Sequence, residues 1–179
     1  MVSPVLSALL DEFRKTKRMG ERAFEQLEDE DFFFKLNPQQ NSVYAIVKHL
    51  SGNMLSRWTD FLTTDGEKAD RNRDTEFELE PGDTRKTILA RWEDGWNLLF
   101  AALTPLTEAD LSRNVPIRGE PHTVLQAVHR QLTHYAYHVG QIVFLARHFA
   151  GSRWRSLSIP KGKSKEFEVA RSGKPYRVR

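Results

Sequence analysis

Residues 123–151, TVLQAVHRQLTHYAYHVGQIVFLARHFAG, decide the fold that this sequence predicts. Apolar side chains recur along them at the three- and four-residue spacing of an α-helix, and Gly151 is well placed to end that helix. The helix is apolar around more than half of its circumference, so we expect neighbours to cover it on several sides. The side chains expected to face the core are Leu125, Val128, Leu132, Ala136, Val139, Val143 and Ala146.

Three further helices are predicted upstream from the same apolar spacing. They cover residues 4–28, 42–62 and 84–103. Ser42 stands where the N-cap of the second helix is expected, and Thr84 or Asp83 does so for the third. Four helices of this length, with no convincing strand between them, predict an all-α four-helix bundle.

The connections between the predicted helices are long, so the expected fold includes crossover connections. Residues 63–83 form a polar segment of 21 residues, longer than the usual connection in a compact domain. Within this segment, we expect the mixed charges of Arg71, Arg73 and Asp74 to order the loop near a cleft. The second long connection precedes residue 123 and contains a predicted helical turn over residues 107–112.

The composition excludes several classes of protein. The chain has 179 residues, enough for one domain with its own core. It has no cysteine, which excludes disulfide scaffolds, Cys-ligated zinc sites, iron–sulfur clusters and a cysteine nucleophile. No apolar run approaches the ~18 residues of a membrane span, and the N-terminus lacks a signal-peptide pattern. We therefore expect a soluble cytoplasmic protein with no membrane partner.

The charge is uneven along the chain and divides it into two parts. Residues 151–179 contain nine Lys and Arg against two Asp and Glu, whereas residues 1–150 carry a net negative charge. We therefore predict a four-helix domain over residues 1–150 and a basic C-terminal extension over 151–179. The extension could be solvated, dock on the bundle or a partner subunit, or bind nucleic acid. Docking is favoured, because the extension contains apolar residues, and we therefore do not expect a nucleic-acid partner. The apolar residues are Trp154, Ile159, Pro160 and Phe167.

Three histidines are candidate metal ligands. His134 and His138 stand four residues apart, on one face of the last predicted helix, so their rings can converge on one ion. The zinc-protease motif is excluded, because it needs Glu where this chain has Tyr135. His49, at the margin of the apolar face of the second helix, is a candidate third ligand. The alternative is that these histidines are solvated, or hydrogen-bonded to a neighbouring helix.

Four segments resemble a known family. His134–Gln141, with the pattern HxxxHxGQ, resembles the closing helix of the DinB-like superfamily, which is unrelated to the polymerase of the same name. Lys48–Met54 resembles the helix that carries the family's first ligand. Residues 71–77 and 156–164 resemble one subgroup whose activity is not established. The resemblance covers nearly the whole chain.

The resemblance implies a metal centre in a homodimeric four-helix bundle. Its ligands would be His49, His134 and His138, binding a divalent metal in a cleft between helices. Three imidazoles favour zinc or nickel, with iron, manganese or copper as alternatives. Members of the superfamily include thiol-dependent transferases and isomerases, which use bacillithiol, mycothiol or glutathione, and presumed hydrolases.

Three neutral ligands leave the +2 charge of an ion uncompensated, which predicts two reactions. An open position can hold water with its pKa lowered toward ~7, giving hydrolysis, or a thiolate, giving S-transfer. Because the chain has no cysteine, the sulfur must come from a low-molecular-weight thiol co-substrate. We expect a metal-dependent enzyme, and we favour S-transfer slightly over hydrolysis. Three polar residues are placed to contact a small anionic substrate: Asn53, Arg57 and Arg130. The alternative is a non-catalytic, metal-stapled homodimer with a structural or interaction role.

Overall fold

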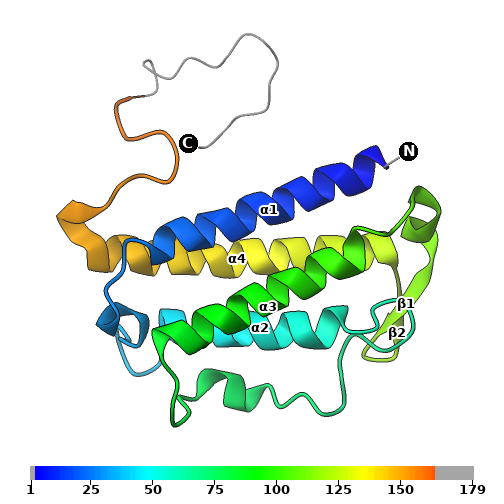
Figure 1. Ribbon diagram of the computed structural model, residues 1–179, viewed down its shortest axis with the longest axis horizontal. Helices are drawn as coiled ribbons and strands as arrows, with labels where there is room; N and C mark the ends of the chain where they lie inside the picture. The colour runs from blue at the N-terminus through cyan, green and yellow to red at the C-terminus, as the bar shows by residue number, and fades with distance from the viewer. Residues whose placement is uncertain (1–2, 164–179) are drawn as a thin grey trace.

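Four α-helices and a two-stranded sheet make up the protein in the computed structural model, which describes residues 3–163 (Figure 1). The helix α1 packs mainly on α4, and α2 packs mainly on α3, with further contacts between α2 and α4. Mostly helical structure agrees with the predicted all-α class. The helices are α1 (Pro4–Phe24), α2 (Val43–Trp58), α3 (Arg85–Leu103) and α4 (Val124–Ala150), and the short 3-10 helices are η1 (Glu30–Phe32), η2 (Asp74–Phe77), η3 (Glu108–Ser112) and η4 (Gly151–Arg153).

The helix starts are set by local capping, as the sequence predicted. The Ser42 hydroxyl accepts the N–H of Ala45, and Thr84 caps α3 in the same way. The predicted turn over residues 107–112 is confirmed as η3. Two helix ends were placed too far along the chain: α1 ends at Phe24 instead of 28, and α2 at Trp58 instead of 62. After α2 the chain reverses at Asp60, whose φ of 49° is left-handed.

The core is rich in aromatic rings, and the buried face of α4 differs from the predicted one. The Phe13 ring is fully buried, and its centroid lies 6.1–6.4 Å from the ring centroids of Trp58, Trp96 and Tyr135. On α4, Ala136 is exposed, whereas Tyr135 is buried. The Tyr135 hydroxyl accepts a hydrogen bond from Trp58 Nε1 at 3.0 Å and donates one to Asn53 Oδ1 at 3.1 Å. Because these two hydrogen bonds satisfy the hydroxyl, Tyr135 can face the core, although the predicted apolar face of α4 did not include it.

A β-hairpin was missed by the sequence analysis, which predicted no strand. Strand β1 (Asn114–Ile117) pairs antiparallel with β2 (Glu120–Thr123), and Pro116 lies opposite Pro121. Prolines are uncommon in strands, so a proline in each of these segments led the sequence analysis away from predicting strands. Arg118 and Gly119 form the two-residue turn, with φ values of 56° and 75°, and their N–H groups both donate to the Asp65 carboxylate.

The long connection between α2 and α3 forms a layer on α2. Figure 1 shows it running from the hairpin end of the molecule back along α2 to the start of α3. Near its end, the buried Lys48 ammonium on α2 donates to the Glu78 carbonyl and to the Glu80 carboxylate, at 2.7 and 2.8 Å. The second half of this connection, which contains η2, therefore lies directly on α2.

The first part of the basic extension lies against the end of α1. Gln26 exchanges two hydrogen bonds with the Arg155 backbone, and Arg22 donates to the carbonyl of the buried Leu157. Arg153 pairs with Glu28 at 2.7 Å. Phe167 lies outside the described residues, so docking of the remaining extension stays a prediction. Within the described range, no helix is long and apolar enough to cross a membrane.

The buried Tyr135 hydroxyl predicts a stability difference between two tyrosines of α4. Tyr135→Phe leaves Trp58 Nε1 and Asn53 Oδ1 buried without their partner, and we expect it to lower the free energy of unfolding by about 1–3 kcal/mol. Urea denaturation followed by circular dichroism measures this loss. Tyr137→Phe, at a 63% exposed site, is the control and should change stability by less than about 0.5 kcal/mol. Equal midpoints for the two variants would contradict this role of Tyr135.

Candidate metal centre

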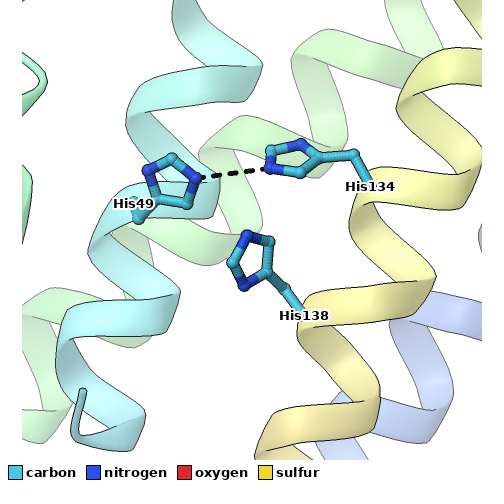
Figure 2. A group of neighbouring side chains, drawn as sticks. All are labelled: His49, His134 and His138. Carbon is cyan, nitrogen blue, oxygen red and sulfur yellow. Dashed lines mark hydrogen bonds between the residues drawn. The ribbon is translucent and has the colours of Figure 1, made fainter. Parts of the chain in front are cut away.

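Three histidines from two helices meet between α2 and α4. His49 comes from α2, and His134 and His138 come from consecutive turns of α4 (Figure 2). One ring nitrogen from each lies within 4.8 Å of the others, and the Nε2 atoms of His49 and His134 are 3.3 Å apart. His49 is buried, whereas the other two are half-buried. The structure therefore brings together all three histidines named from the sequence, here called the triad.

Hydrogen bonds on the outer side of two rings fix which nitrogen faces inward. His49 Nδ1 donates to Glu76 Oε2 at 2.8 Å, and His138 Nδ1 donates to Gln141 Oε1, also at 2.8 Å. A neutral imidazole protonated at Nδ1 has its lone pair on Nε2. In Figure 2 the rings turn nitrogen atoms toward a common point. Such outer-side acceptors are typical of metal-binding histidines.

Burial keeps the half-buried histidines neutral. It lowers the pKa of His134 to about 3, assisted by the neighbouring His138 and His49, and burial also lowers the pKa of His138. Neutral rings are the form that binds metal. Tetrahedral zinc with Zn–N bonds of about 2.0–2.1 Å requires nitrogen atoms about 3.4 Å apart, close to the 3.3 Å between the Nε2 atoms of His49 and His134. The donor set therefore fits a divalent ion.

Glu76, which the sequence analysis did not single out, links the triad to the long connection. The buried carboxylate accepts from His49 and also from Arg71, whose Nε and Nη2 donate at 2.8 and 2.9 Å. Burial alone would raise the pKa of Glu76, but the hydrogen bonds from His49 and Arg71 outweigh it and lower that pKa. A second carboxylate, Glu67, accepts from Arg71 Nη1 at 3.2 Å. Glu76 is therefore ionised and fixed in orientation.

The predicted loop residues have different roles. Arg71 is largely buried and binds Glu76, which agrees with the predicted role of ordering the loop near the site. Arg73 is exposed, and Asp74 begins η2. The mixed-charge cluster and the resemblance of residues 71–77 thus indicated this segment, but neither identified Glu76 as the acceptor. Phe77, at the end of η2, stacks on the His49 ring with centroids 5.1 Å apart.

The three residues expected to contact substrate are not equivalent in the structure. Asn53 is buried and bonded to Tyr135 in the core. Arg57 is also buried, 3.8 Å from Glu67, and its Nε and Nη1 have no hydrogen-bond partner among the residues that the structure describes. Arg130 is exposed on α4. Only Arg130, of these three, is accessible to a solute without movement of the core.

The close fit of Gly52 under Glu76 predicts opposite effects for two Gly→Ala substitutions in helices. A Cβ at Gly52 would overlap Oε1 of Glu76, whose carboxylate Arg71 and His49 hold in place, so Gly52→Ala should destabilise the fold. A Cβ at Gly140 meets no atom within 4 Å, so Gly140→Ala should stabilise by about 1 kcal/mol through helix propensity. Thermal unfolding of both variants measures this. Equal stabilisation by both would show that Glu76 is free to move.

Comparison with known proteins identifies the family but no characterised relative. No match was found among curated proteins or among solved structures. A family model described as "Protein of unknown function (DUF1572)" matches residues 1–163, which include the triad, Glu76 and Arg71. Since this match covers most of the 179 residues, the chain belongs to the DUF1572 family.

Proposed function

We propose that this protein is a divalent-metal-dependent enzyme of the DinB-like type, with His49, His134 and His138 as the ligands. The observation that carries the proposal is the convergence of three ring nitrogens, with the outer nitrogens of two rings bound by Glu76 and Gln141. The pairing of α1 with α4 and of α2 with α3 supports a four-helix bundle of that superfamily. Zinc and nickel are the favoured ions, because both suit imidazole ligands.

The bound ion would supply Lewis-acid chemistry, activating a thiolate or a water molecule. The chain's own residues supply position. His49 is locked by Glu76 on the buried side, and the half-buried His134 and His138 leave the α4 side of the triad partly open to solvent. Since three hydrogen bonds from His49 and Arg71 occupy the Glu76 carboxylate, Glu76 is a positioning residue.

Transfer of sulfur from a small thiol is the reaction we favour over hydrolysis. The chain has no cysteine to compete as ligand or nucleophile, so an external thiol would be the only sulfur donor. Its proton would pass to solvent, and the sulfur–carbon bond would form as the carbon loses its leaving group. The alternative is a non-catalytic homodimer in which the ion staples α2 to α4, which is favoured by the origin of the triad in two different helices.

Metal content tests the ligand set directly. We expect elemental mass spectrometry of the untagged protein to give about one zinc or nickel ion per chain, with loss of the ion in His49→Ala and His138→Ala. His129→Ala is the matched control, because His129 is exposed on α4 outside the triad. No metal in the wild type, even after incubation with zinc or nickel, would refute the proposal.

Two further measurements separate the enzyme from the staple. For an enzyme with an open position, chelator should shift the melting temperature little, and glutathione should produce a sulfur-to-metal charge-transfer band in the cobalt-substituted protein. A staple should show a large fall in melting temperature with chelator and no such band, because its coordination is saturated.

A further inference from the structure

A cavity of about 540 Å³ lies between α4, the start of α2 and the segment before α2, and its size is that of a small-molecule site. The segment between η1 and α2 closes one side of it, and α4 forms another wall. It is lined by Leu36, Gln39, Gln40, Asn41, Ile46, Tyr137, Gly140, Gln141, Phe144 and Leu145.

This cavity adjoins the triad. Ile46 lies three residues before His49 on α2, and Gln141 lies three residues after His138 on α4, so each is about one helical turn from a ligand. Gln141 belongs to both places, because its Oε1 accepts the Nδ1–H of His138 while its side chain lines the cavity. A molecule in the cavity would therefore sit beside the metal centre.

The lining carries no charge. None of the ten lining residues is Asp, Glu, Lys, Arg or His, in the part of the chain that the structure describes. Four carboxamide side chains supply hydrogen-bond donors and acceptors, and the remaining side chains are mostly aliphatic or aromatic. An ion moved here would lose hydration without gaining an opposite charge, which is costly. An uncharged molecule would exchange its water hydrogen bonds for those of the carboxamides.

Two features of α4 favour a ligand over an empty groove. Tyr137 and Phe144 are 63% and 68% exposed, although large aromatic side chains are usually buried. Between them, Gly140 leaves open space where any other residue would place a side chain. A second cavity, of about 380 Å³, lies against Glu76 and contains the charged Lys48, Arg91 and Asp94. The uncharged lining is thus a property of the cavity beside His138.

We infer that the cavity beside His138 binds the substrate of the metal centre, and that this substrate is an uncharged organic molecule. Its body is aromatic or branched aliphatic, and it carries amide- or hydroxyl-type groups that match the carboxamides. The inference rests on the proposed function, since it assigns the uncharged reaction partner to this cavity. An anionic thiol would then bind at the ion itself.

A pair of probes that differ only in charge tests the selectivity. N-acetyl-L-phenylalaninamide is neutral, and N-acetyl-L-phenylalanine is its carboxylate counterpart. In ligand-observed NMR titrations of the zinc-loaded protein, we expect the neutral probe to bind at least about 10-fold more tightly, a difference of about 1.4 kcal/mol. Equal affinities, or tighter binding of the carboxylate, would overturn the inference if Gly140→Leu abolishes that binding, because the carboxylate would then lie in the cavity and not at the ion.

Variants of α4 locate the binding. Gly140→Leu places a side chain in the cavity from a position where a Cβ meets no atom within 4 Å, and it should abolish binding of the neutral probe, with circular dichroism unchanged. Thr133→Leu is the matched control: it lies seven residues earlier on the same exposed face and should bind normally. Phe144→Ala, which removes an exposed wall of the cavity, should weaken binding and supplies a second, independent variant. Unchanged binding in both cavity variants would place the probe elsewhere.

Cobalt substitution links the cavity to the metal centre. Cobalt(II) at the triad should broaden the proton signals of the bound neutral probe, whereas zinc should not. Probe binding without this broadening would refute a substrate role for the cavity. A protein that takes up no cobalt would refute the proposed metal centre instead, and the affinities of the two probes would still decide the chemistry of the cavity.

Discussion

The buried carboxylate of Glu76, held between His49 and Arg71, is the interaction on which the candidate site depends. It satisfies three donors that α2 and the long connection bury together. Leaving one such group unpaired costs about 1–3 kcal/mol, and more when the group is charged. Gly52 provides the space, because any side chain there would overlap the carboxylate. The geometry of the triad and the path of the long connection therefore both depend on the Glu76 carboxylate.

The same constraint explains why α2 is the most enclosed helix at the site. Fourteen of its sixteen residues are buried, among them polar side chains such as Lys48, His49 and Arg57. The helix α3 covers one side, α4 another, and the connection with η2 a third. A helix enclosed in this way can hold a histidine rigidly. The two histidines of α4, which are half-buried, form the more accessible side of the triad.

Local signals explain what the sequence predicted correctly. Caps such as Ser42 and Thr84 act within four residues, so helix starts are visible in the sequence. The pairing of His134 with His138 is equally local. His49 was a candidate from its position on the second helix, and the resemblance implied the full ligand set. The hairpin depends on Asp65 binding a turn more than fifty residues away, and Glu76 reaches His49 across 27 residues. Such distant partners, like the buried Tyr135, have no periodic signature in the sequence.

Charge distribution around the triad provides a reason for two reaction partners to bind in different places. The charge of Glu76 is balanced by Arg71, so neither reduces the +2 charge of an ion on neutral imidazoles. That charge would attract a thiolate or hydroxide directly to the ion. Beyond Gln141 the cavity has no charged lining, so an anion entering it would gain nothing, while an uncharged molecule would keep its hydrogen bonds. The ion would thus bind the anionic nucleophile, and the cavity would bind the uncharged electrophile. Gln141 connects the two places, because it accepts from His138 and lines the cavity.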